Sequence, residues 1–369
     1  MTLRSTKRLI YCLALLVFLV GVGPLAAQVP TVDDPLPPPR PRPTPKPTPT
    51  PTPTPEKPVS LDDDDIVRVT SNLVVVPVSV TDGQGNPVLG LKTTDFHLEE
   101  EGRGKEIATI GDPGQVPLDI AVLLDVSGSV NARFEFERDA AARFLREVLR
   151  PGDRATVFTI GEKSQLVQAL GPAEAAIASL RGVQPTKGPT AFYDTVVEAV
   201  HQLSEKTTTA RRRVLIIISD GVDNFSQKIK EGVGSTYDQQ LASPLELTLQ
   251  LNERERGATQ REIQRAEAAF YSINPSASIL HLDIPASRAQ NGMERIAQAT
   301  GGNFFLPTTE AELGVAFRQI ASELRSQYLL QYYANDTALD GQFLRINVTT
   351  PTRPNATIRA RQGYYAKRK

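Results

Sequence analysis

The sequence predicts an α/β protein built on a doubly wound, mostly parallel sheet, and three observations support this fold class. Two short apolar runs, residues 118–124 and 213–218, are rich in branched side chains, which is typical of strands buried on both faces. A polar turn follows each run directly. Between residues 115 and 326, segments of strand type alternate with segments of helical apolar spacing, which indicates a sheet covered by helices on both faces.

The segments flanking this region are rich in β-branched residues and turns. The expected strands are 66–70, 72–81 and 95–99 on one side, and 327–333, 343–350 and 357–361 on the other. Neither set has enough strands to be stable alone. We therefore expect the two sets to pair into one small discontinuous β-sandwich, with the α/β domain inserted between them.

Within the α/β region, the spacing of apolar residues predicts the order of the elements. The expected helices are 131–149, 190–203 and 310–324, and the expected strands after the first are 155–160, 164–170, 278–284 and 303–306. The strand over 164–170 is expected at an edge of the sheet. Thr309, with Glu312 three residues later, is a capping-box signature for the start of the last helix.

Residues 223–262 are long for a connection and mostly polar. Four leucines at alternate positions, Leu245, Leu247, Leu249 and Leu251, are compatible with a short strand. Ser243 and Pro244 instead give a helix-start signal, and Leu, Glu and Gln favour helix. We expect an inserted helical excursion beside the edge of the sheet where the polar turns lie, with a surface loop as the alternative.

The N-terminal part of the chain predicts export. Residues 1–27 combine a positive start, an apolar stretch and a small-residue cleavage site, as a secretory signal peptide does, and an uncleaved membrane anchor is the alternative. The lone Cys12 lies in this segment, so the mature chain would have no disulfide and no thiolate site. No membrane span would remain after cleavage. The following Pro/Thr-rich stretch favours extended polyproline II and predicts a semi-rigid spacer, with its threonines bare or glycosylated.

The formal net charge of −1 gives no basic field that would indicate a nucleic-acid partner.

The predicted organisation has five parts. The parts are a signal peptide (1–27), a linker (28–65), the first part of the β-sandwich (66–113), the α/β domain (114–326) with its helical insertion (about 223–262), and the second part of the sandwich (327–369).

The polar turns after the two apolar runs carry the candidate chemistry. The first is Asp125-Val126-Ser127-Gly128-Ser129, and the second is Ser219-Asp220-Gly221. Between them lies a Gly/Pro loop that contributes the hydroxyl of Thr190. Ligands of open α/β sheets bind at the carboxyl ends of the strands. Carboxylate and hydroxyl oxygens there suit a hard cation such as Mg²⁺ or Ca²⁺.

Together these segments resemble the metal-ion-dependent adhesion site of the von Willebrand factor A (VWFA) domain family, which has a Rossmann-like fold. The matching residues are Asp125, Ser127, Ser129, Thr190 and Asp220. The flanks are similar to those of secreted bacterial proteins of the VWFA-related (acidobacterial type) domain family. Four segments carry that likeness, residues 72–78, 82–88, 91–96 and 360–365.

The resemblance implies a metal site and a type of partner. Ser127, Ser129 and Thr190 would be direct ligands of Mg²⁺ (or Mn²⁺/Ca²⁺), with Asp125 and Asp220 as charged supports. A carboxylate of a partner protein would then complete the coordination. Asp194 is expected only as a helix-start residue, while Asp223 could support the metal indirectly. The alternative is that all these side chains merely cap helices and end strands.

The function predicted from the sequence is therefore a secreted or cell-envelope protein-binding module, with adhesion among its possible roles, and not an enzyme. One alternative is an assembly factor of envelope complexes that needs no metal. A serine hydrolase is the other, using Ser127 or Ser129 with His97, His201 or His281 as base. No nucleophile-elbow motif surrounds either serine.

Overall fold

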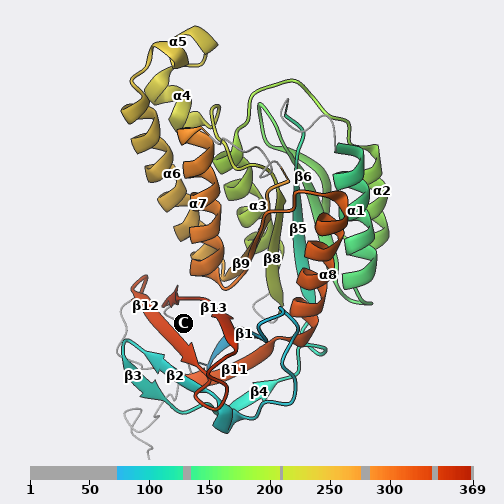
Figure 1. The fold of residues 1–369 in the computed structure, drawn as a ribbon, viewed down its shortest axis with the longest axis vertical. Helices are drawn as coiled ribbons and strands as arrows, with labels where there is room; N and C mark the ends of the chain where they lie inside the picture. Colours follow the sequence, from blue (N-terminus) through green and yellow to red (C-terminus); the bar gives the residue numbers. More distant parts are fainter. Residues whose placement is uncertain (1–72, 128–133, 208–210, 276–282, 335–339, 367–369) are drawn as a thin grey trace, which may run out of the picture. The chain divides into compact units, whose positions relative to one another are not determined.

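A six-stranded sheet forms the centre of the α/β region in the computed structural model, which describes residues 73–127, 134–207, 211–275, 283–334 and 340–366 (Figure 1). The strand order is β10-β9-β8-β5-β6-β7. All pairings are parallel except that of β7 with β6, so the sheet is mostly parallel, as predicted. The strand expected at an edge is the edge strand β7, and it is antiparallel. In chain order the strands are β5 (Leu118–Asp125), β6 (Arg154–Ile160), β7 (Gln165–Gly171), β8 (Arg212–Ile218), β9 (Ala268–Ile273) and β10 (Phe304–Phe305).

Helices cover both faces of this sheet, because its central strands are apolar on both sides. Alternate residues of β5 separate into two cores: Ile120 and Val122 belong to one, and Ala121 and Leu123 to the other. The first core contains α1 (Phe134–Val148), α2 (Ala173–Gly182) and α8 (Glu310–Ser326). The second contains α3 (Phe192–Lys206), α6 (Leu245–Arg265) and α7 (Ile284–Thr300). This is the doubly wound arrangement expected from the sequence.

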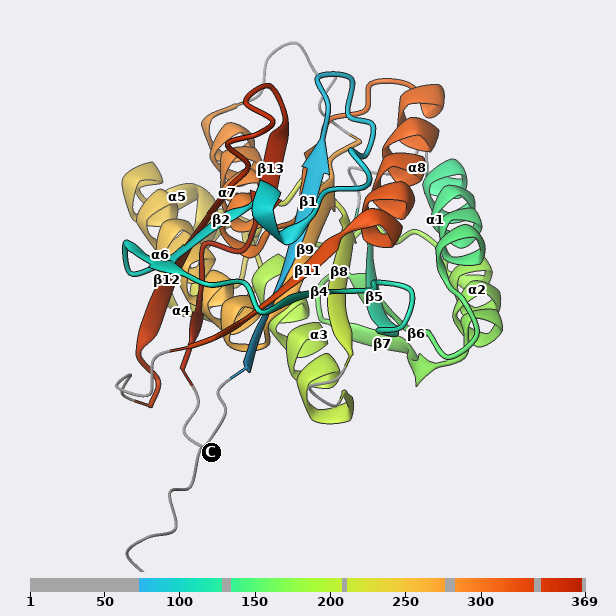
Figure 2. The same cartoon turned by 90° about the horizontal axis from the view of Figure 1, so that it is seen from below.

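Strands from the two flanks pair with one another (Figure 2). One sheet has the order β13-β1-β11-β4 and the other the order β14-β12-β2-β3. Four valines of β1 (Val74, Val76, Val78 and Val80) share one core with alternate apolar residues of β11 and β12. The strands are β1 (Leu73–Thr81), β2 (His97–Glu100), β3 (Arg103–Lys105), β4 (Thr109–Gly111), β11 (Tyr328–Tyr333), β12 (Phe343–Thr349), β13 (Thr357–Ala360) and β14 (Gly363–Tyr365), and a 3₁₀ helix, η2 (Thr93–Asp95), precedes β2.

Arg212, at the start of β8, joins the two regions. Its buried guanidinium donates to the carbonyl of Pro113, before β5, and to that of Leu324, near the end of α8. It also donates to Oε1 of Gln327, which precedes β11. One side chain therefore satisfies backbone carbonyls of both connections between the sandwich and the α/β domain.

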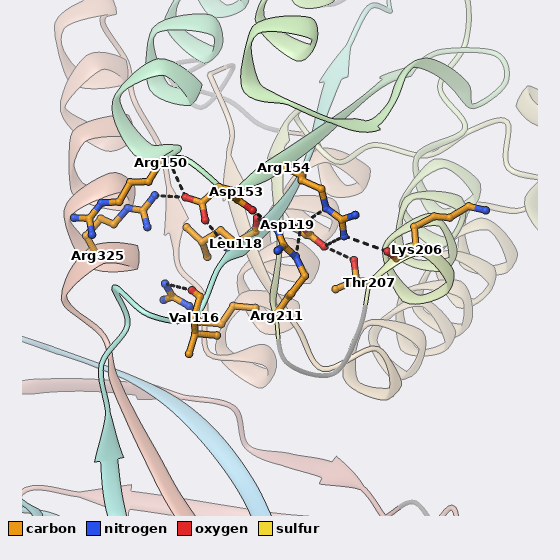
Figure 3. A network of polar contacts seen from close by, with 12 residues as sticks. Val116, Leu118, Asp119, Arg150, Asp153, Arg154, Lys206, Thr207, Arg211 and Arg325 are labelled. Atoms are coloured by element: carbon orange, nitrogen blue, oxygen red, sulfur yellow. Dashed lines mark hydrogen bonds and ion pairs between the residues drawn. The ribbon is translucent and has the colours of Figure 1, made fainter.

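A charged network lies at the amino end of the central strands (Figure 3). The carboxylate of Asp119 on β5 is fully buried and accepts hydrogen bonds from Arg154, Arg211 and Thr207. Nearby, Asp153 accepts from the backbone N–H of Leu118 and pairs with Arg325 of α8. The network ties β5, β6 and α8 together at the edge opposite the carboxyl ends of the strands.

One strand prediction was wrong. The sheet continues with β9 at Ala268–Ile273, not at 278–284. Asp283 instead caps α7, with its side chain accepting from the N–H of Ala286, and Ile284 is the first residue of that helix. The remainder of the predicted strand lies outside the described residues. Two alanines begin β9 directly after a long helix, so its β-propensity is weak.

The predicted signal peptide, the linker and the strand over 66–70 lie outside the described residues. Among the residues that are described, no helix combines the length and apolarity needed to cross a membrane. The contacts divide the chain after Ile66, and every element described above belongs to the unit Val67–Lys369.

Deleting residues 327–369 should destabilise the N-terminal flank and not only the tail. β11 lies between β1 and β4, so its loss removes a hydrogen-bonded neighbour from both strands. Hydrogen exchange on the truncated chain should show lost protection across residues 73–111. Unchanged protection there would contradict the shared sheet.

Candidate functional site

Asp125 ends β5 with its side chain almost completely buried, at 1% exposure. One carboxylate oxygen accepts a hydrogen bond from the hydroxyl of Ser219 at 2.6 Å, and the other accepts from the backbone N–H of Ser127 at 2.9 Å. Burial, and secondarily the charge of Asp220, raise the pKa of Asp125 to about 6, although these hydrogen bonds oppose the shift. A carboxylate is thus held in the interior close to a second carboxylate.

Asp220 follows β8 in the turn Ser219-Asp220-Gly221. Its carboxylate accepts from the N–H of Val222 at 3.0 Å, and the hydroxyl of Ser219 accepts from the N–H of Gly221 at 3.0 Å. Gly221 has φ +77°, and a Cβ there would lie 2.6 Å from Sδ of Met293. Only glycine fits this sharp exit, which directs the chain away from the strand immediately after the aspartate.

Thr190, in the loop before α3, is held by its backbone. Its N–H donates to Oδ1 of Asn224 at 2.8 Å, and its carbonyl accepts from the N–H groups of Asn224 and Phe225. The hydroxyl of Thr190 has no hydrogen-bond partner among the described residues. The backbone of this mostly buried residue is therefore fixed, while its side-chain oxygen remains available to a ligand.

The same loop is tied to the ends of β5 and β6. The carbonyl of Val126 accepts from both the N–H and the hydroxyl of Thr186, and the carbonyl of Gly161 accepts from the N–H of Ala191. Residues on either side of Thr190 are thus bonded to the turn that follows Asp125 and to the end of the neighbouring strand. Together with the bonds from Asn224 and Phe225 to Thr190, they bring the three predicted segments to one edge of the sheet.

The first turn of α3 is capped from the loop after β8. The residue before the helix, Ala191, supplies no side-chain cap. The N–H of Tyr193 instead donates to Asp223, and that of Asp194 donates to the hydroxyl of Ser226. Asp223 is buried, which raises its pKa, and its oxygens also accept from the N–H groups of Phe225 and Ser226. Asp223 thus fastens the loop to α3, and Asp194 is a helix-start residue, as predicted.

The segment after this loop is helical, comprising α4 (Gln227–Val233), α5 (Tyr237–Ala242) and α6. The alternating leucines at its centre lie in the first turns of α6. Hydrogen bonds connect the segment to residues that surround the candidate site. The N–H of Gln227 donates to Asp194 at 2.8 Å, and Nε2 of Gln240 in α5 donates to the carbonyl of Asn224 at 2.8 Å.

Four of the five predicted site residues are described: Asp125, Ser127, Thr190 and Asp220. Ser129 lies outside the described residues. Ser127 is buried and bonded through its N–H to Asp125, and Asp220 is near enough to Asp125 to raise its pKa. Sequence reasoning missed Ser219, which donates to Asp125, and Asn224, which holds Thr190. The position of Ser219 between a buried strand and Asp220 was the available signal.

The donor set fits a hard divalent cation. It consists of carboxylate and hydroxyl oxygens, without sulfur or imidazole. The buried carboxylate of Asp125 receives its hydrogen bonds from neutral donors and lies beside a like charge. A cation would offset this electrostatic cost. Within the described ranges, no group of three or more His, Cys, Asp or Glu side chains is placed to hold a metal, and this candidate set has two carboxylates with hydroxyls.

The two described histidines have carboxylate neighbours. His97, on β2, lies 3.2 Å from Glu99, and His201, on α3, lies 3.7 Å from Glu262. Both side chains are more than half exposed. His281 lies outside the described residues.

Comparison with known proteins identifies one sequence family. Residues 120–222 match the model of the von Willebrand factor type A domain, and this range contains Asp125, Ser127, Ser129, Thr190 and Asp220. No curated protein matches the chain.

Solved structures with a similar fold are distant in sequence. The PilB minor pilin from Streptococcus sanguinis is 12% identical with a TM-score of 0.43, and the match covers 58% of this chain and 62% of that chain. The chain thus spans less than two thirds of the pilin. The vWF domain of the type V pili tip protein Mfa5 from Porphyromonas gingivalis is 15% identical with a TM-score of 0.41, covering 56% and 94%. A von Willebrand factor type A protein from Catenulispora acidiphila is 11% identical with a TM-score of 0.42, covering 81% and 75%.

Proposed function

Because the chain contains a von Willebrand factor type A domain, we propose that it is a protein-binding module that recognises an acidic group of a partner protein through a divalent cation. The residues that would hold Mg²⁺ (or Mn²⁺/Ca²⁺) are Asp125, Ser127, Ser129, Thr190 and Asp220. Ser127, Ser129 and Thr190 would supply direct oxygen ligands, and the aspartates would supply the balancing charge.

The observation that carries this proposal is the difference in hydrogen bonding between the backbone and the side chain of Thr190. Three hydrogen bonds fix its backbone, whereas its hydroxyl has no partner among the described residues. Residues that only cap helices or end strands would be expected to use their side-chain oxygens on nearby N–H groups. Asp223 does this, and Asp125 and Asp220 each accept from one such N–H, but Thr190 does not.

Different residues of the chain would have different roles in recognition. Asp125 is oriented by Ser219 and Ser127, which also keep it from turning toward solvent. The carboxylate of Asp220 lies in the turn after β8 and adds negative charge to the site. When bound, the cation would act as a Lewis acid that accepts an oxygen of the partner's carboxylate. Two carboxylates roughly balance a divalent charge, so an anionic partner remains electrostatically acceptable.

We place the protein outside the cytoplasm, in the envelope or secreted. Residues 1–27 support this location because they have the three parts of a signal peptide. The Pro/Thr-rich residues 28–65 would act as a spacer that holds the folded part away from a surface.

The proposal can be tested by affinity capture from envelope extract, with the chain from Gln28 onward as bait. Partner proteins should be retained in Mg²⁺ and released by chelator. Capture should also fail after the carboxylates of the extract have been amidated with carbodiimide and glycinamide. A chain bearing Asp82→Ala, which removes a carboxylate from an exposed turn of the sandwich, should capture as well as the parent. Equal capture in Mg²⁺ and chelator would contradict the proposal and favour a metal-independent assembly factor.

A further inference from the structure

We infer that Asn224 is a positioning residue for the metal site, and that the helical insertion α4–α6 braces it through Gln240. The inference rests on the proposed function, since it assigns a residue that acts on the ligand Thr190 without touching the cation itself. Asn224 follows Asp220 by four positions, so it belongs to a segment that also supplies a charged support.

Asn224 contacts Thr190 from two directions. Its side-chain Oδ1 accepts from the N–H of Thr190 at 2.8 Å, while its own N–H donates to the carbonyl of Thr190 at 3.1 Å. Fixing both polar groups of one residue restricts its φ and ψ. A threonine with a fixed backbone has few χ1 positions, so the direction of its hydroxyl is restricted as well. Asn224 can therefore determine where the Thr190 oxygen lies.

The insertion supplies the next contact. Nε2 of Gln240 donates to the carbonyl of Asn224 at 2.8 Å and to that of Gly234 at 3.3 Å. It thus connects α5 both to the end of α4 and to the loop that holds Thr190. The carbonyl of Asn224 accepts from Gln240, whereas its N–H and Oδ1 bond to the backbone of Thr190. Asn224 therefore links the insertion to the candidate site.

The arrangement makes metal affinity depend on residues that do not contact the metal. Removal of residues that orient metal ligands typically lowers metal affinity by about 10–100-fold. Asn224 is itself exposed, so its replacement removes no core packing. A loss of affinity without loss of fold is therefore the expected signature of its role.

The test is Mg²⁺ titration calorimetry on the chain from Gln28 onward, on Asp125→Ala and on four further variants, with thermal unfolding in chelator as the measure of fold. Asn224→Ala should weaken Mg²⁺ binding by about tenfold or more. Asn224→Asp keeps an oxygen acceptor at the same position and should restore affinity to at least the parent value. Gln240→Ala should weaken binding several-fold. Gln250→Ala removes a comparable exposed amide of α6, which donates to Glu246 and has no hydrogen bond to the Thr190 loop among the described residues, and should change nothing.

The outcomes separate this inference from the proposed function. If the parent binds Mg²⁺ and Asp125→Ala does not, but Asn224→Ala and Gln240→Ala both bind as tightly as the parent, then the positioning role is wrong and the metal site stands. If the parent binds no Mg²⁺, the proposed function itself fails. An affinity lost in Asn224→Ala and not recovered in Asn224→Asp would also overturn the inference.

Discussion

Replacing Asp119 with alanine is expected to lower the free energy of unfolding by about 3–5 kcal/mol, the usual cost of breaking a buried ion pair from one side. The Asp119 carboxylate is fully buried and lies 2.6 Å from Arg154 and 2.7 Å from Arg211 (Figure 3). Its loss would leave these two guanidinium groups facing each other at the start of β5. Urea unfolding measures the change.

The pH dependence of the free energy of unfolding tests this prediction a second time. Burial alone would raise the pKa of Asp119, but hydrogen bonds from Arg154, Arg211 and Thr207 outweigh burial and lower the pKa below its ordinary value. The stabilisation is therefore present above the unfolded-state pKa of about 3.9 and is lost as pH falls through the lower folded-state pKa. The difference between parent and Asp119→Ala should shrink below about pH 4.

The control is Lys228→Ala, which breaks an exposed pair with Glu231 at 2.9 Å on α4 and should change the free energy of unfolding far less, because water screens that pair. Equal effects of Asp119→Ala and Lys228→Ala would show that the network contributes no more than a surface pair.

Replacing Asp125 with alanine is expected to abolish stabilisation by Mg²⁺ while leaving the metal-free fold largely intact. In the parent, Mg²⁺ at about 100 times its dissociation constant should add about 2.7 kcal/mol to the free energy of unfolding. The variant should gain nothing. Removal of a carboxylate whose pKa burial raises to about 6 also relieves an unfavourable buried charge, so the metal-free protein should lose little stability.

Thermal unfolding with and without Mg²⁺ tests this prediction, and Asp82→Ala is again the matched carboxylate control. An Asp125→Ala protein stabilised by Mg²⁺ as strongly as the parent would show that Asp125 does not support a metal.

The sequence was most informative where a strand is buried on both faces. The run ending at Asp125 and the run before Ser219 both form central strands, because continuous branched residues leave no polar face. The start of the last helix was also predictable, because the Thr309 hydroxyl caps it by accepting from the N–H of Glu312. The reciprocal bond of the predicted capping box is shifted by one residue, since the Glu312 carboxylate accepts from the N–H of Thr308. The capping signal lies within four consecutive residues, so it can be recognised from a single sequence.

The remaining features could not be predicted, because they depend on contacts between segments that are far apart in the sequence. β9 was misplaced because the alanines that begin it are weak strand formers, and its parallel pairing with β8 determines its conformation. Asn224 could not be recognised, since its contact with Thr190 joins positions separated by 34 residues. The cap on α3 likewise comes from Asp223 in another loop, and not from the residue before the helix.

The most direct test of the metal-dependent site is calorimetric titration of Mg²⁺ into the chain from Gln28 onward and into its Asp125→Ala and Asp220→Ala variants. The parent should bind one Mg²⁺ per chain, and both variants should bind it severely less tightly or not at all, with unchanged circular dichroism. A parent that binds no Mg²⁺, or variants that bind it with parental affinity, would contradict the account.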